Sequence, residues 1–101
     1  MTGVSDDPSV NAYHVEFQPS ARTAWHTHSG PQLLVVLSGR CRFQRAGQGV
    51  DVADAGDVVS IPPNEQHWHG ADPGAPMTHL AININATTTW LHKVNDAEYD
   101  G

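Results

Sequence analysis

Residues 25–39 read WHTHSGPQLLVVLSG, and they carry the clearest strand pattern in the chain. Side chains two positions apart in a strand point to the same side, so His26 and His28 share one face of a short strand. The continuous apolar run at 33–37 predicts a second strand that is buried on both faces. Gln32 lies at the start of this second strand, in phase with its apolar residues. The stretch therefore predicts a strand with paired imidazoles, followed closely by a buried strand.

Short strand-like segments separated by glycine and proline continue through the rest of the chain. We expect further strands at 13–17, 40–45, 50–53, 58–61, 67–71, 77–84 and 90–94, and a final helical turn at 95–99. Many short strands with regular turn residues are typical of an all-β sandwich or barrel. The expected organisation is one domain, with a flexible N-terminal arm at 1–10, a barrel at 11–94 and a C-terminal tail at 95–101.

Composition restricts the classes of partner. The chain has 101 residues and a net charge of −6, with five basic residues and no basic run, which argues against a nucleic-acid or anionic-membrane surface. No stretch has the length of a membrane span, and the acidic N-terminus does not resemble a secretory signal. A lone Cys41 is expected to be a small packing residue in a reduced, cytoplasmic protein. A core this small favours a homo-oligomer, a dimer or a tetramer.

Histidine is the unusual residue, with seven copies in the chain. A second His-x-His pair, His67 and His69, lies in a later expected strand. Two ligands from one strand and others from a neighbouring strand are what a metal site on a β scaffold requires. The intervening Trp68 and the preceding Trp25 should point away from the metal, covered by neighbouring strands, the N-terminal arm or a second subunit.

The order of these residues resembles the cupin family from Tyr13 to Val94. The family's first motif is Gly-x5-His-x-His-x3,4-Glu-x6-Gly, and the same spacing is found here at Ser20, His26, His28, Gln32 and Gly39. The second motif is Gly-x5-Pro-x-Gly-x2-His-x3-Asn, and it corresponds to Gly56, Pro62, Asn64, His67 and Ala71. The resemblance implies a jelly-roll β-barrel that holds one divalent metal ion through His26, His28, Gln32 and His67.

Gln32 departs from the acidic ligand of the family motif. Three neutral imidazoles and a neutral amide leave the charge of a divalent ion uncompensated, which makes a stronger Lewis acid and a weaker metal site. The alternative is that Gln32 does not coordinate and that three histidines hold the ion alone.

A narrower resemblance concerns the strings at 21–28, 66–71 and 77–82, which look like the small cupin-type hydroxynitrile lyases. Those relatives also carry glutamine at the position of Gln32. They depend on manganese and cleave or form cyanohydrins such as mandelonitrile. The resemblance therefore implies manganese, with iron, nickel or zinc as alternatives, and a small-molecule substrate.

Two further histidines are candidate catalytic residues. His69 shares a face with His67 and is either a general base or a group that orients a ligand. Strand alternation alone would send His79 to solvent, whereas the resemblance sends it into the cavity together with Asn83. We favour the cavity and interpret His14 and His92 as surface residues.

Two other functions compete with a lyase. A three-histidine centre with open coordination positions also suits a non-haem iron dioxygenase, although the usual carboxylate ligand is missing. A metal-dependent module that binds a small ligand without turnover is the third possibility, because a fold alone does not determine a function.

Overall fold

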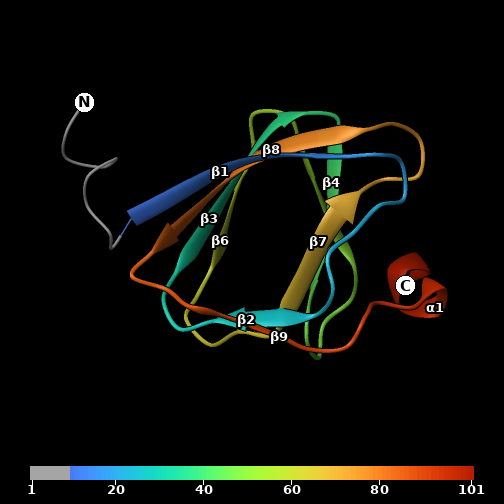
Figure 1. Ribbon diagram of the computed structural model, residues 1–101. Coiled ribbons are helices and arrows are strands. Elements are labelled where there is room, and N and C mark those ends of the chain that lie inside the picture. The colour runs from blue at the N-terminus through green and yellow to red at the C-terminus, as the bar shows by residue number, and fades with distance from the viewer. Residues whose placement is uncertain (1–9) are drawn as a thin grey trace.

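The computed structural model describes residues 10–101, so nearly all of the expected N-terminal arm lies outside the described residues. Over this range the chain forms nine strands and one short helix (Figure 1). Their bounds are β1 Val10–Phe17, β2 His26–His28, β3 Gln32–Ser38, β4 Arg40–Arg45, β5 Asp51–Asp54, β6 Val58–Ile61, β7 His67–Ala71, β8 Met77–Ile84, β9 Thr88–Trp90 and α1 Asp96–Asp100.

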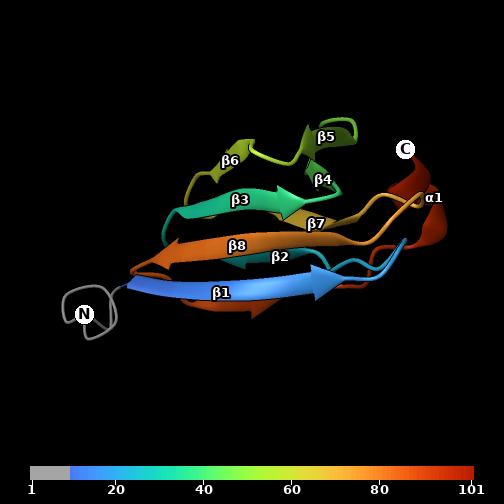
Figure 2. The ribbon, with the colours of Figure 1, turned by 90° about the horizontal axis from the view of Figure 1, so that it is seen from above.

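The strands form two antiparallel sheets that face each other. One sheet has the order β1-β8-β3-β6 and the other has the order β5-β4-β7-β2-β9. Figure 2 shows β1, β8 and β3 side by side in one layer, with β2, β7 and β4 behind it. The non-sequential order within each sheet is the jelly-roll arrangement, which confirms the all-β barrel predicted from the sequence.

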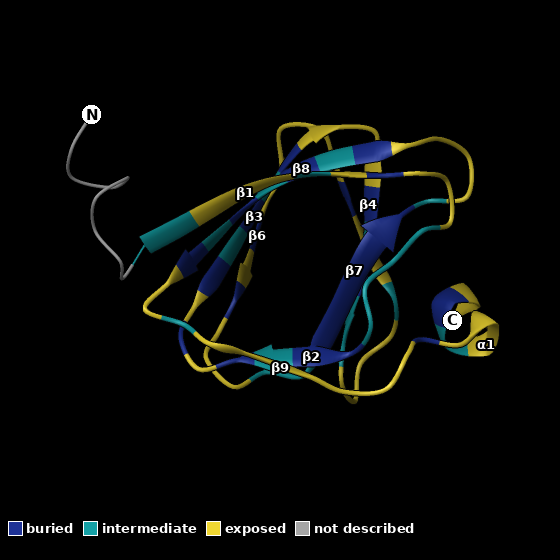
Figure 3. Ribbon diagram, in the orientation of Figure 1, coloured by how far each residue is buried: buried dark blue, intermediate teal, exposed yellow. Residues whose placement is uncertain are grey.

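The apolar core lies between the two sheets. Its members include Phe17, Leu34, Val36, Cys41, Phe43, Ile61 and Met77. Cys41 is fully buried, as a packing residue should be, and this burial raises the pKa of its thiol to about 12. Most of β7 and β2 is buried as well, whereas much of β1 is exposed (Figure 3).

Two expectations about strands are wrong. The run at 33–37 is not buried on both faces, because Leu34 and Val36 point into the core while Leu37 is 47% exposed. In an antiparallel sandwich each sheet packs one face on the core and leaves the other face outside. The strand expected at 90–94 is instead β9, which ends at Trp90, and the chain then turns towards α1.

Two family glycine positions carry other residues without disturbing the fold. Ser20 and Asn64 both adopt left-handed backbone, with φ of 66° and 65°. Asparagine tolerates this region better than most residues, as expected for Asn64.

The two tryptophans next to the ligand strands are covered, but by a segment that we did not expect. Trp25 is 5% exposed and Trp68 is fully buried, and both pack against Val94 and Tyr99. Within the described residues, the C-terminal segment therefore provides this cover. The helical turn expected at its start is present as α1.

Candidate metal centre

Strand pairing brings the first three candidate ligands together. His26 on β2 lies directly opposite His67 on β7, and His28 follows two positions later on the same face of β2. One ring nitrogen from each of these histidines lies within 4.8 Å of those of the other two. All three side chains are buried, so the group forms a compact cluster on the inner face of the barrel.

Hydrogen bonds on the far side of each ring fix the orientation of the cluster. The Nδ1 atom of His26 donates to the Ala24 carbonyl and that of His67 donates to the Glu65 carbonyl, both at 2.8 Å. The Nδ1 atom of His28 lies 2.9 Å from the Thr88 hydroxyl. Because a carbonyl can only accept, the neutral rings of His26 and His67 present an unprotonated Nε2 on the other side.

The chemistry of this donor set fits a cation. Burial lowers the pKa of His26 to about 4 and that of His67 to about 3, and it lowers the pKa of His28 as well. These imidazoles are therefore neutral at neutral pH, with lone pairs available for coordination. The Nε2 atom of His28 is buried and has no hydrogen-bond partner among residues 10–101, and a bound ion would satisfy it.

Gln32 adds a side-chain oxygen to this set of candidate donor atoms. Its Nε2 atom donates to Asn83 Oδ1 at 2.8 Å, which leaves its Oε1 atom 3.1 Å from Nε2 of His67. With this assignment of the Gln32 amide, Oε1 of Gln32 and the unprotonated Nε2 of His67 are both acceptors, and no proton lies between them. Neighbouring ligands of an octahedral ion with bonds of about 2.1 Å lie about 3 Å apart, so the spacing suits coordination. The role of Gln32 as a ligand stays a prediction.

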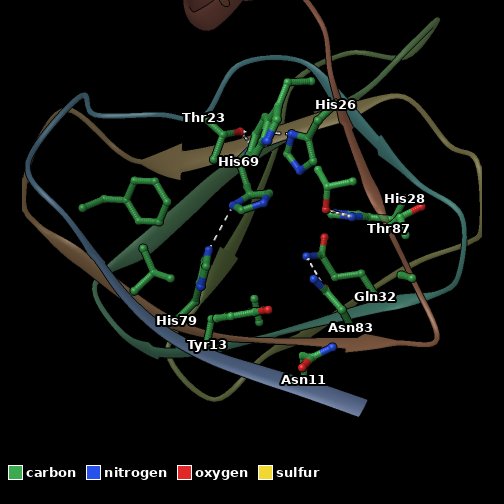
Figure 4. A pocket seen from close by; sticks show the side chains of 16 residues that line it. Asn11, Tyr13, Thr23, His26, His28, Gln32, His69, His79, Asn83 and Thr87 are labelled. Atoms are coloured by element: carbon green, nitrogen blue, oxygen red, sulfur yellow. Dashed lines mark hydrogen bonds between the residues drawn. The ribbon is translucent and has the colours of Figure 1, made fainter. Parts of the chain in front are cut away.

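A cavity of about 640 Å³ opens beside these groups. Figure 4 shows His26, His28 and Gln32 pointing into a shared space, with Asn83 bonded to Gln32. Val15, Phe17 and Ala81 give the cavity an apolar side. Two partly exposed aromatic rings, Tyr13 and Trp90, also line the cavity. The cavity therefore has a polar end at the candidate ligands and an apolar side.

His69 and His79 both line this cavity, as the resemblance implied for His79. His79 Nε2 lies 2.9 Å from His69 Nδ1, so the two rings share one hydrogen bond. Burial, reinforced by neighbouring histidines with His79 first among them, holds the pKa of His69 well below its usual range. The catalytic roles of both residues stay predictions, whereas His14 and His92 are exposed.

Thr88 is a site residue that the sequence analysis missed. Its hydroxyl contacts His28 only because β9 pairs with β2, with Thr88 opposite His28. No motif marks this threonine, and the only signal would have been the pairing of the two strands. Thr23 is similar, because its hydroxyl accepts the backbone N–H of His69 at 3.3 Å.

Comparisons with known proteins agree with this architecture. The Cupin domain family model matches residues 13–83. An (R)-mandelonitrile lyase from Granulicella tundricola is 45% identical over 97 residues, which cover 92% of this chain and 74% of that protein. A solved cupin-like protein from Thermotoga maritima has a TM-score of 0.87 at 40% identity, covering 90% of this chain and 71% of its own.

A more distant solved structure shows the fold alone. A DMSP lyase from Ruegeria pomeroyi is 18% identical with a TM-score of 0.74, covering 89% of this chain and 47% of that one. In the described part of the chain, no helix has the length and apolar character needed to cross a membrane. The family match, the close relatives and the three-histidine cluster lead to one conclusion: the chain belongs to the cupin family.

Proposed function

We propose that this cupin is a metal-dependent lyase of the hydroxynitrile lyase type, which cleaves or forms cyanohydrins such as mandelonitrile. The ligands would be His26, His28, Gln32 and His67, and the ion would be a single divalent metal, manganese before iron, nickel or zinc. The observation that carries the proposal is a donor set with no negative charge at the polar end of a half-apolar cavity. The relative named as a mandelonitrile lyase supports it.

When bound, the ion supplies positive charge beside the substrate hydroxyl oxygen or the departing cyanide. Cleavage of a cyanohydrin removes the hydroxyl proton, forms the C=O bond and releases the electron pair of the carbon–carbon bond with cyanide. The proton needs an acceptor in the cavity, and the described residues that line it include no carboxylate. His69 and His79 are therefore the groups proposed to accept it.

The hydrogen bond between the two histidines suits this task. If His69 Nδ1 donates to His79 Nε2, then His69 Nε2 carries the lone pair that accepts the hydroxyl proton. In cyanohydrin formation the protonated His69, with Nδ1 still donating to His79, would return this proton to the developing hydroxyl oxygen. The apolar wall, with Phe17 and Val15, would hold the hydrocarbon part of the substrate and exclude water.

Mandelonitrile turnover by manganese-loaded protein is the direct test. We expect benzaldehyde to form faster than in a metal-free sample and faster than the background rate. Protein loaded with manganese that leaves mandelonitrile untouched contradicts the lyase proposal.

The same centre suggests a second candidate, a non-haem iron dioxygenase. Three histidines with open positions on the cavity side favour it, and the absence of a carboxylate among the described lining residues weakens it. Oxygen consumption by iron-loaded protein would support this reading. Binding of a small ligand without turnover would support the non-catalytic module instead. We further infer a homo-oligomer and a cytoplasmic, reducing location.

A further inference from the structure

The last eight residues, Val94 to Gly101, form what we call the C-terminal clamp. They contain α1, which begins at a capping box in which the side chains of Asn95 and Glu98 each accept a hydrogen bond from the other's backbone N–H. Val94 and Tyr99 form a buried cluster with Trp25 and Trp68. This cluster is separate from the core between the sheets, and α1 lies outside the barrel on the side of β7 (Figure 1).

Both the hydroxyl and the ring of Tyr99 make contacts with neighbouring residues. Its hydroxyl donates to the Ala71 carbonyl at the end of β7, and its ring lies 5.7 Å from that of Trp68. The guanidinium carbons of Arg22 and Arg42 lie 4.4 and 4.8 Å from the ring centroid. Each arginine also has an acidic partner, Asp96 for Arg22 and Asp72 for Arg42. This many contacts indicates a built attachment rather than a loose tail.

The clamp packs against Trp25 and Trp68, which are sequence neighbours of the candidate ligands His26 and His67. Trp68 lies between His67 and His69 on β7, and Trp25 directly precedes His26. The indole N–H of Trp25 donates to Glu98 at 3.2 Å. The Trp25 backbone is tied to the residues that lead into the clamp, because its N–H donates to the His92 carbonyl.

Few backbone bonds connect β2 itself to β7, although the segment before β2 is bonded to β7 through Thr23 N–H to the His69 carbonyl and Ala71 N–H to the Ala21 carbonyl. The two strands pair at one position only, His26 opposite His67, within the described sheet. By contrast, β4 and β7 pair over five positions, from Cys41 opposite Ala71 to Arg45 opposite His67. The side chains packed behind the two strands therefore add to these few backbone bonds in setting the spacing between His26 and His67.

We infer that the C-terminal clamp positions the metal centre and that Tyr99 is its principal positioning residue. The clamp holds β2 against β7 so that the Nε2 atoms of His26 and His67 stay at the spacing that one ion requires. Outer contacts that orient metal ligands typically change metal affinity by about 10–100-fold when they are removed. The inference concerns metal binding and does not depend on which reaction the centre performs.

The test is the dissociation constant for Mn²⁺, measured by calorimetry on metal-free protein. We expect Tyr99→Ala to weaken Mn²⁺ binding by about 10–100-fold. Tyr99→Phe keeps the ring and loses only the bond to the Ala71 carbonyl, so its effect should be smaller. Tyr99→Leu fills the cluster without an aromatic ring and serves if the alanine variant does not fold.

The matched control is Met77→Ala. Met77 is fully buried like Trp68, but it lies on β8 in the main core and is not among the residues that line the cavity. Its replacement should lower the melting temperature and leave the Mn²⁺ affinity unchanged. If folded Tyr99→Ala or Tyr99→Leu loses thermal stability as Met77→Ala does but binds Mn²⁺ like the wild type, the clamp is merely structural and the inference is overturned. Wild-type protein that binds no Mn²⁺ contradicts the metal centre itself.

Discussion

Gln32 determines the charge of the proposed centre, because the other candidate ligands are neutral imidazoles. Replacing it with glutamate adds one negative charge beside the ion. We expect Gln32→Glu to bind Mn²⁺ as tightly as the wild type or more tightly, and to turn over mandelonitrile more slowly, since the added charge weakens the Lewis acid. Calorimetry and the initial rate measure the two effects. Gln32→Ala with unchanged Mn²⁺ affinity would show that three histidines hold the ion alone.

Replacing His69 or His79 should lower activity without lowering metal content, unlike replacing a metal ligand. His69→Ala or His79→Ala should lower kcat for mandelonitrile cleavage by about two to four orders of magnitude, the range for losing a general base. Metal content, measured by elemental analysis, should stay at the wild-type level. His14→Ala is the matched control, because His14 is exposed on the outer side of β1. Full activity in both cavity variants would remove these histidines from the mechanism.

Because of Cys41, the unfolding free energy of the protein should fall at alkaline pH. Its pKa is about 12 in the folded state against an ordinary value of 9.0, so the unfolded chain loses this proton first as the pH rises. The contribution is present below pH 9.0 and is lost by about 1.4 kcal/mol per pH unit between the two values. Denaturant melts of wild type and Cys41→Ala at pH 8 and about pH 10.5 test this. The difference in unfolding free energy between the two proteins should shift in favour of the alanine variant at the higher pH, and a constant difference would contradict the assignment.

For single residues, the sequence predicts the placement of those that belong to a recognised motif. His26, His28 and His67 converge as the spacing indicated, and Asn64 adopts the left-handed backbone expected of it. Thr88 could not be predicted, because its position beside His28 arises from strand pairing across 60 residues.

Among the elements, the sequence predicts well several strands that have a glycine or proline within two or three residues of at least one end. The ranges 40–45, 58–61, 67–71 and 77–84 agree with β4, β6, β7 and β8. The segment at 90–94 has strand-like residues, but Trp25 bonds with the backbone of Leu91 and His92 while the chain already turns towards α1. The local pattern therefore could not show where this strand ends.

Metal binding should stabilise the fold, because the candidate ligands join β2, β3 and β7. Mn²⁺ at 100 times its dissociation constant should raise the unfolding free energy by about 2.7 kcal/mol. For a domain of this size, each kcal/mol shifts the melting temperature by about 4–8 °C. Thermal melts with Mn²⁺ and with a chelator measure the difference. A His26→Ala/His67→Ala double variant should melt at the same temperature in both conditions.

Considered as a whole molecule, the barrel has one sheet face that the described chain does not cover. The outward residues of β3, β8 and β6 are aliphatic except for Thr78 and Ser60, and register places Leu80, Val35 and Val58 in one row across the three strands. Leu37 and Val58 are 47% and 58% exposed. Soluble monomers rarely leave a large continuous apolar patch in water. The sequence predicted the apolar run of β3 but not that its outer half would lie on this face.

We expect a second copy of the chain to cover this face. The strands of this sheet hold 8, 8, 7 and 4 residues, so at about 3.3 Å per residue and about 4.8 Å between strands the flat footprint is about 430 Å². Protruding side chains make the accessible area larger than this footprint, and a stable interface buries roughly 800 Å² per partner. Like sheet faces can pack on each other about a two-fold axis, which makes the second copy the simplest occupant. Light scattering after size exclusion should therefore give an oligomer for the wild type and a lower mass for Val58→Lys. Leu91→Lys, at a residue that is also partly exposed but lies outside the two sheets, should leave the mass unchanged. A monomeric wild type, or a Val58→Lys variant with the wild-type mass, would show that this face is not the interface.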